Sequence, residues 1–343
     1  MTMADPMNDA PYRGLGWAHG CLTVQRLGAM LAPVTFLLPD GRQVSPMQVA
    51  PWAGEPGTEE LPGILRRLRG EWPCVPFGYS VPPDGFTPAW AAAMRPAEPD
   101  EELHGHSSNV DWDWQEAEAG TLKLSVAYPE TSKVARVERT ITPDPDSPAV
   151  DITFRIEVRE DCRLPIGLHP TFRLPLVLGG ARLEPGRFDH GLTYPSTVEP
   201  EAPLFAIDAR FDDLAAVPGR FGTVVDASRL PLANDAEELL QLNGVDGTAA
   251  LASETEGYRM RLTWQPEHFP SLLLWYSNQG RKMAPWSGRH LAIGIEPVCS
   301  PFGLGPATAR ADNPIAASGT PTALAFSAGE PFVTRYRIAV EPL

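Results

Sequence analysis

The chain has 343 residues, of which 43% are hydrophobic and 21% are charged, a balance that is ordinary for a globular protein and excludes an intrinsically disordered chain. Its 28 basic and 43 acidic residues give a net charge of −15, so nucleic acid and anionic membranes would be repelled over most of its surface. No segment is long and apolar enough to cross a bilayer, and we expect a cytoplasmic protein.

Alternation of apolar and polar residues predicts half-buried strands along the chain. The clearest case is residues 150–158, where Val150, Ile152 and Phe154 alternate with polar residues. The same period of two marks residues 122–126, 258–264 and 336–340, and the apolar runs 272–276 and 291–295 predict strands buried on both faces. Helical patterns are confined to residues 64–68 and 236–242, each of which predicts a short helix.

The fold class follows from this shortage of helices. Parallel strands need crossover helices between them, so the sheets must be mainly antiparallel. The 38 prolines and 30 glycines are scattered, which suits many short strands joined by turns. We therefore predict an all-β fold, with residues 1–14 as a disordered tail and residues 15–343 as one domain, because no linker divides the chain.

Two segments carry a titratable residue inside an apolar, strand-like run. His169 is followed by Pro170, and Glu296 is followed by Pro297. The residue before proline is restricted to extended backbone, which holds each side chain on a stiff local frame. A single histidine or glutamate in such a position is usually structural. The two together favour an acid–base pair, in which an apolar setting raises the pKa of the carboxyl group and the imidazole titrates near neutrality.

Four segments, in order along the chain, carry a family resemblance. The His-Pro-x-Phe pattern at 169–172 and the apolar-Glu-Pro strand at 293–297 resemble the catalytic strands of aldose 1-epimerases. Residues 68–78 and 104–112 are similar in motif and spacing to segments of the hexose-6-phosphate mutarotase branch. The chain is thus identified by resemblance as a member of the galactose mutarotase-like, aldose 1-epimerase superfamily. This implies a large antiparallel β-sandwich, the galactose mutarotase-like supersandwich.

The resemblance also implies an activity: the interconversion of sugar anomers by acid–base ring opening, without a metal or an organic cofactor. Glu296 would take the proton of the anomeric hydroxyl, and His169 would protonate the ring oxygen. His104 would hydrogen-bond the sugar, and Arg69 would position it. Trp275 is either a core aromatic or a platform for the C–H face of a pyranose, since aromatic rings pack on such faces.

Two positions depart from the hexose-6-phosphate pattern. Ser108 stands where that branch carries an arginine, and a serine offers no charged fork to a phosphate, which argues against a 6-phosphate substrate. His106 replaces a phenylalanine, and in an extended strand it would face the same side as His104. Both histidines are candidates for substrate binding. His104 is preferred for its neighbouring glycine and its spacing to Trp112.

Other functions remain open from the sequence alone. There is no Gly-x-Ser-x-Gly, Walker, Gly-x-Gly-x-x-Gly or His-Glu-x-x-His motif and no Cys-x-x-Cys pair, so hydrolase, nucleotide and zinc sites lack support. A carbohydrate-binding protein without turnover is one alternative, because a fold does not fix a function. Another isomerase or lyase reaction on a larger saccharide is the other. The sequence does not reveal which sugar binds or whether the chain oligomerises.

Overall fold

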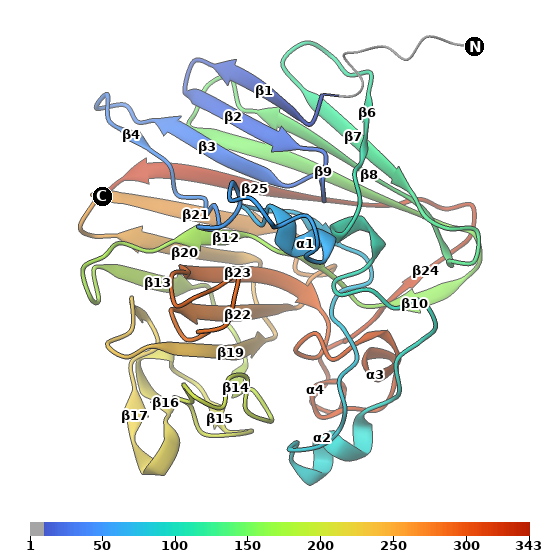
Figure 1. Cartoon of the computed structure of the whole chain (residues 1–343), viewed down its shortest axis with the longest axis vertical. Helices are drawn as coiled ribbons and strands as arrows, with labels where there is room; N and C mark the ends of the chain where they lie inside the picture. Colours follow the sequence, from blue (N-terminus) through green and yellow to red (C-terminus); the bar gives the residue numbers. More distant parts are fainter. Residues whose placement is uncertain (1–9) are drawn as a thin grey trace.

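Two large antiparallel sheets form the framework of the chain in the computed structural model, which describes residues 10–343 (Figure 1). The first sheet has nine strands in the order β18-β13-β20-β21-β25-β9-β8-β7-β6. Its strands are β6 (Asp113–Gln115), β7 (Leu122–Ala127), β8 (Val134–Pro143), β9 (Ala149–Val158), β13 (Ala181–Pro185), β18 (Arg229–Leu230), β20 (Thr248–Ser253), β21 (Tyr258–Trp264) and β25 (Phe332–Pro342). The strands expected at 122–126, 150–158, 258–264 and 336–340 are confirmed as β7, β9, β21 and β25.

The second sheet has eight strands, seven of them in the order β15-β14-β19-β22-β23-β11-β5, with β12 paired to β23. Its strands are β5 (Pro73–Cys74), β11 (Ile166–Leu168), β12 (Thr171–Arg173), β14 (His190–Thr193), β15 (Arg210–Phe211), β19 (Ala236–Asn243), β22 (Ser271–Asn278) and β23 (Leu291–Cys299). The apolar runs at 272–276 and 291–295 are confirmed as strands β22 and β23, at the centre of this sheet.

Smaller elements surround the two sheets. One four-stranded sheet contains β1 (Tyr12–Trp17), β2 (Gly20–Gln25), β3 (Leu31–Leu37) and β4 (Gln43–Val44). Two-stranded pairs are β10 (Cys162–Leu164) with β24 (Leu324–Phe326), and β16 (Val217–Pro218) with β17 (Val224–Val225). The helices are short: α1 (Gly63–Arg66), α2 (Pro88–Ala93), α3 (Pro306–Arg310), α4 (Pro314–Ala317), and the 3₁₀ turns η1 (His106–Ser108), η2 (Leu214–Ala216) and η3 (Arg220–Gly222).

The main hydrophobic core lies between the two large sheets. Ile152 and Phe154 of β9 belong to the same buried cluster as Leu272 and Leu274 of β22. Because successive side chains of a strand point to opposite faces, these residues of β22 cover one side of its sheet. The predicted antiparallel β-sandwich is therefore confirmed.

The opposite face of the eight-stranded sheet supports a second hydrophobic cluster. Leu273 and Trp275 of β22 point to this side, where they pack with Trp72 and Phe302. Helix α1 lies beside the same cluster through Ile64, at the place where the sequence predicts a short helix. The strands of this sheet therefore separate the main core on one side from a second layer of side chains on the other.

Two sequence predictions are wrong in detail. Residues 236–242 form β19 rather than a helix, because β14 and β22 pair with both edges of this segment and its acidic side chains find buried partners. Tertiary pairing outweighs helix propensity here. The predicted tail of residues 1–14 is too long, since β1 begins at Tyr12 and pairs with β2; residues 1–9 lie outside the described residues. Across residues 10–343, no helix is long and apolar enough to cross a membrane.

Candidate active site

Glu296 projects from the middle of β23 into the second layer. In the sheet register it lies opposite Leu273 of β22, and only 1% of its surface is exposed. Its Oε1 atom makes no hydrogen bond to any described residue. Buried carboxyl oxygens are normally hydrogen-bonded, so an orphaned one directed into a cavity indicates a functional group.

Gly294 provides the space that this carboxyl group occupies. Gly294 precedes Glu296 by two residues on β23 and therefore shares its face. A Cβ atom at this position would lie 2.3 Å from Glu296 Oε1 and 3.0 Å from the Cβ of Trp275. Both distances are shorter than ordinary contacts, so the position of the carboxyl group depends on the absence of a side chain at residue 294.

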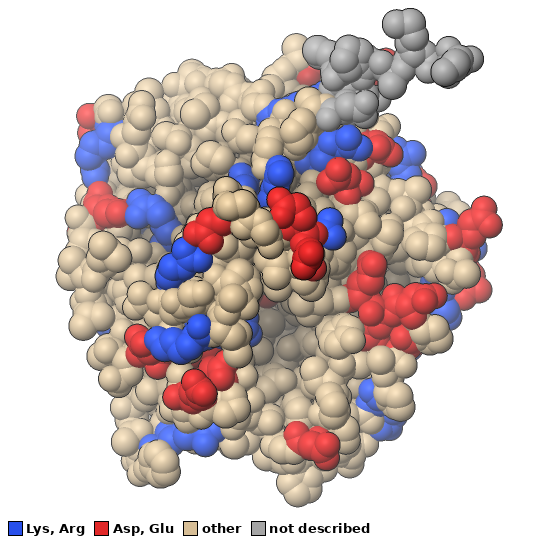
Figure 2. All heavy atoms as spheres, in the orientation of Figure 1, with Lys and Arg blue, Asp and Glu red and all other residues tan. Residues whose placement is uncertain are grey.

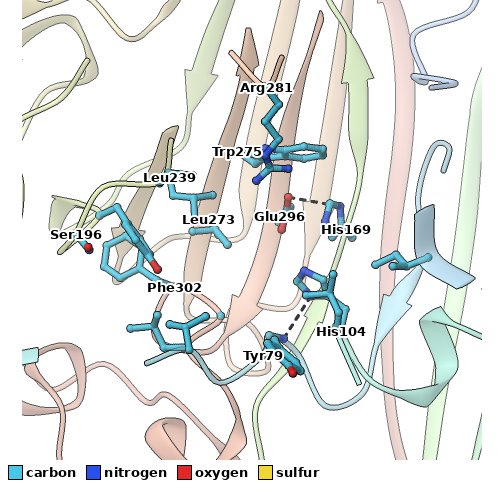
Figure 3. A pocket seen from close by; sticks show the side chains of 18 of the residues that line it. Tyr79, His104, His169, Ser196, Leu239, Leu273, Trp275, Arg281, Glu296 and Phe302 are labelled. Atoms are coloured by element: carbon cyan, nitrogen blue, oxygen red, sulfur yellow. Dashed lines mark hydrogen bonds and ion pairs between the residues drawn. The ribbon is translucent and has the colours of Figure 1, made fainter. Parts of the chain in front are cut away.

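His169 faces Glu296 from the turn between β11 and β12. Its backbone N–H donates to the carbonyl of Trp72 (2.9 Å), and its ring stacks on the Trp72 ring with centroids 4.2 Å apart at 14°. Its Nδ1 lies 3.4 Å from Glu296 Oε1 and 3.3 Å from Thr171 Oγ1 (Figure 3). The turn and the stacked indole thus fix the imidazole beside the carboxyl group.

Burial shifts the proton equilibria of both groups toward their neutral forms. It raises the pKa of Glu296 well above the usual carboxyl value. It also lowers the pKa of His169 well below the usual imidazole value, and nearby His104 lowers it further. The near-neutral imidazole pKa expected from the sequence is therefore wrong. Burial therefore favours the uncharged form of each group.

The pair lies in a cavity of about 660 Å³. Figure 2 shows a hollow in this face of the molecule, with charged side chains on parts of its rim. The lining includes Trp72, His104, His169, Trp275, Arg281 and Glu296. Within residues 10–343, no group of three or more His, Cys, Asp or Glu residues is placed to hold a metal ion.

Solved structures with the same architecture were found across almost the whole chain. The Slr1438 protein from Synechocystis sp. PCC 6803 matches over 100% of both chains, with a TM-score of 0.64 and 14% identity. The GalM/aldose epimerase homologue from C. elegans matches over 97% of this chain and 99% of its own, with a TM-score of 0.62 and 16% identity. A galactose mutarotase-like protein from Lactobacillus casei ATCC 334 matches over 96% and 100%, with a TM-score of 0.57 and 16% identity.

The chain has the galactose mutarotase-like fold. The solved structures do not single out the hexose-6-phosphate branch. No protein-family model and no curated protein sequence matches the chain. Because of this fold, the cavity around Glu296 and His169 is called the mutarotase-like cleft.

Of the two candidate histidines, His104 lines the mutarotase-like cleft and His106 does not. The backbone turns between them, because His104 and Gly105 both have positive φ (56° and 77°) and His106 begins the 3₁₀ turn η1. The alternation expected of an extended strand therefore fails. His106 Nδ1 instead lies 3.3 Å from Glu102 Oε2, and the His106 ring packs against the ring of Tyr128.

His104 is placed to donate a hydrogen bond in the cleft. Its Nδ1 accepts from the backbone N–H of Gly78 (3.3 Å), so the ring hydrogen resides on Nε2. Its ring lies edge-on to His169 with centroids 5.2 Å apart. Burial lowers the pKa of His104 to about 4, which keeps the ring uncharged at neutral pH.

Arg69 lies outside the mutarotase-like cleft, although its neighbour Leu68 lines it. The Arg69 Nε donates to the carbonyl of Arg67 (3.1 Å), and its guanidinium lies over the ring of Tyr12 at 5.4 Å. Residue 69 pairs with Val49 in a bridge, and neighbouring residues of extended backbone point to opposite sides. Arg69 therefore cannot position a ligand beside Glu296.

Arg281 is a cation in the lining of the cleft that the sequence motifs did not predict. It lies in the loop between β22 and β23, with its guanidinium 4.8 Å from the ring centroid of Trp286 and 3.4 Å from Glu237 Oε1. The same Glu237 oxygen accepts a hydrogen bond from Trp275 Nε1. Buried Glu237 thus contacts both Arg281 and Trp275. In the sequence, Glu237 was visible only as an acidic residue in a segment for which a helix was predicted.

Ser108 is buried behind the cleft rather than facing it. Its hydroxyl donates to the carbonyl of His104 (2.7 Å) and accepts from Trp72 Nε1 (3.1 Å). Ser108 therefore braces two residues of the cleft, and its own hydroxyl does not line the cavity.

Proposed function

We propose that this protein is a cofactor-independent aldose 1-epimerase that interconverts the anomers of an unphosphorylated sugar. The observation that carries the proposal is the buried pair of Glu296 Oε1 and His169 Nδ1, 3.4 Å apart in a concave cleft. Acid–base chemistry needs two groups that exchange protons with one substrate and whose pKa values are set by their surroundings. The fold shared with aldose epimerase homologues agrees with this chemistry.

Ring opening needs one proton acceptor and one proton donor, and these two groups supply both. Glu296 takes the proton from the anomeric hydroxyl as a C=O bond forms at C1. The bond from C1 to the ring oxygen breaks, its electron pair goes to the ring oxygen, and His169 gives that oxygen a proton. Rotation about the C1–C2 bond and the reverse transfers then produce the other anomer.

This cycle needs the ionised carboxylate and the protonated imidazole, whereas burial favours the neutral pair. A bound sugar would stabilise the charged pair, because hydrogen bonds to a charged form favour that form. His104 Nε2 is placed to donate one such bond to a sugar oxygen, and Trp275 lines the same cleft with an aromatic ring, a group on which sugar C–H faces pack.

The test is the rate of anomer interconversion, followed by proton NMR or polarimetry across a panel of free aldoses and their 6-phosphates. We expect acceleration of one or more unphosphorylated aldoses and none for the phosphates, and loss of that acceleration in Glu296→Gln. Exposed Glu330 supplies a matched control, Glu330→Gln, which should retain the full rate.

The outcomes separate the proposal from its rivals. Unchanged turnover in Glu296→Gln would reject the assigned chemistry. Sugar binding by calorimetry without any rate acceleration would instead support a carbohydrate-binding protein. A change in the mass of an oligosaccharide after incubation with the protein, measured by mass spectrometry, would indicate chemistry on a larger glycan.

A further inference from the structure

The mutarotase-like cleft is larger than one sugar ring requires. Its volume is about 660 Å³. Because a water molecule takes about 30 Å³ in the liquid, this space holds the equivalent of about twenty water-sized groups, whereas a hexose has about a dozen non-hydrogen atoms. A sugar ring placed at Glu296 and His169 would leave a large part of the cavity unfilled.

The remaining space borders an apolar wall, defined here as Phe86, Tyr194, Leu239, Leu273 and Phe302. All five line the cavity and belong to the second hydrophobic cluster. The Tyr194 ring packs edge-on against both Phe86 and Phe302, each with centroids 5.6 Å apart. Figure 3 shows Leu239, Leu273 and Phe302 on the side of Glu296 that lies away from His169. The acid–base pair and the apolar wall are thus two neighbouring parts of one cavity.

Few polar groups accompany this wall. Ser196 donates its hydroxyl hydrogen to the carbonyl of Gly85 (3.0 Å), and Thr197 accepts from Arg220 (2.6 Å). Tyr194 also lines the cavity, so its hydroxyl is one polar group of this wall. A sugar hydroxyl buried against the carbon side chains would lose its partners, which weakens binding by roughly tenfold to a hundredfold per group.

Charge is equally scarce along the wall. The guanidinium of Arg281 lies 3.4 Å from Oε1 of Glu237, which is two residues from Leu239 on β19, so this cation is already paired with a buried carboxyl group. Asp84 also lines the cavity, but it is exposed and carries a negative charge. Among the described residues that line the cavity, a phosphate, sulfate or carboxylate beside the wall would therefore find only Arg281, whose charge is already paired with Glu237.

We propose that the substrate is a reducing sugar that carries an uncharged apolar substituent, an alkyl, acyl or aryl group, which packs on the apolar wall. The inference rests on the proposed epimerase function, since it places the anomeric carbon between Glu296 and His169. The anomeric hydroxyl must be free to react, so the substituent is attached at another carbon of the ring.

The experiment measures the affinity of a series of glucose and galactose ethers with linear alkyl chains on O4 or O6, from methyl to hexyl, by calorimetry. Binding is measured with the Glu296→Gln variant, so that affinity is read separately from turnover. One of the ether series should bind about fourfold more tightly for each added methylene until the wall is covered, because a buried methylene contributes about 0.8 kcal/mol. In the wild type, the longer ethers of that series should also show the higher kcat/KM for anomer interconversion.

Substitutions in the wall test the location of the substituent. Leu239→Ser and Phe302→Ser, each in the Glu296→Gln background, should flatten the dependence of affinity on chain length. The matched control Leu176→Ser changes a leucine that is 90% exposed and outside the cavity, and it should keep the full dependence. Two different wall variants are used so that a folding defect in one leaves the other as a test.

The outcomes distinguish the two proposals. Affinity that is independent of chain length, or that falls with it, in every series would overturn the apolar substituent, even if the parent sugars are converted. Affinity that rises with chain length, without conversion of any sugar by the wild type, would support the ligand class and reject the epimerase function.

Discussion

Replacement of Gly294 by alanine should impair the acid–base pair while it leaves the sandwich folded. The added Cβ would lie 2.3 Å from Glu296 Oε1, and ordinary contacts begin near 3.4 Å, so the carboxyl group must move by about 1 Å. The added methyl group cannot move away from the carboxyl group, since the Cβ of Trp275 lies 3.0 Å from the same point. A displacement of about 1 Å at a reacting group can cost about a hundredfold in rate. We expect a fall in kcat of that order, with a smaller change in KM.

The assay is exchange spectroscopy of the two anomers by proton NMR at saturating sugar, with thermal unfolding measured in parallel. Gly54→Ala is the matched control, because a Cβ at Gly54 would meet nothing within 4 Å. In the Glu296→Gln background, the Gly294→Ala change should reduce the rate no further, since the group that it displaces is already inactive. A folded Gly294→Ala protein with the wild-type kcat would refute the steric argument.

Two further predictions concern stability. Because burial raises the pKa of Glu296 in the folded state, the stability that this group contributes is complete below about pH 4.5 and is lost as the pH rises through the raised pKa. Above pH 4.5, the free energy of unfolding should therefore fall less steeply with pH in Glu296→Gln than in the wild type. The difference in slope should be up to about 1.4 kcal/mol per pH unit, and pH profiles of equal slope for the two proteins would contradict this. Arg139→Met should lower the free energy of unfolding in urea by about 3–5 kcal/mol, because it leaves fully buried Glu71 without its cation. Arg289 is exposed and pairs with Glu55, so Arg289→Met should lower the free energy of unfolding by less than about 1 kcal/mol. Equal losses of stability in the two variants would show that burial of the pair of Glu71 and Arg139 is unimportant.

The Glu71 and Arg139 pair also connects the sandwich to the site. Arg139 of β8 donates to Glu71 and to the carbonyl of Ala29, and Tyr336 of β25 donates to Glu71 as well. Glu71 precedes Trp72, whose ring stacks on His169. The nine-stranded sheet therefore holds the segment on which the imidazole of His169 rests.

The candidate acid–base residues could be found from the sequence because their signals are local. His169 and Glu296 each stand before a proline in an apolar run, and each resembles a family motif. The structure places both in one cleft. His104 was preferred over His106 for its neighbouring glycine, and that glycine lies in the turn that separates the two side chains.

Other parts of the site depend on contacts between distant segments. Arg281, Leu239 and Phe302 come from three separate regions of the chain, and no local pattern distinguishes them from loop or core residues. Arg69 was assigned to the cleft from its motif, but the side of the chain on which it lies is set by pairing with Val49.

Local sequence patterns were sufficient to predict most of the long strands and the antiparallel sandwich, because a period of two is a property of neighbouring residues and decides which face of a strand is buried. The conformation of residues 236–242 required tertiary contacts, since strands on both sides satisfy the backbone of β19 and its two glutamates acquire buried partners. The shape of the cleft required them as well. A cavity is the space left between segments that are remote in sequence, and its size and polarity arise only when those segments pack.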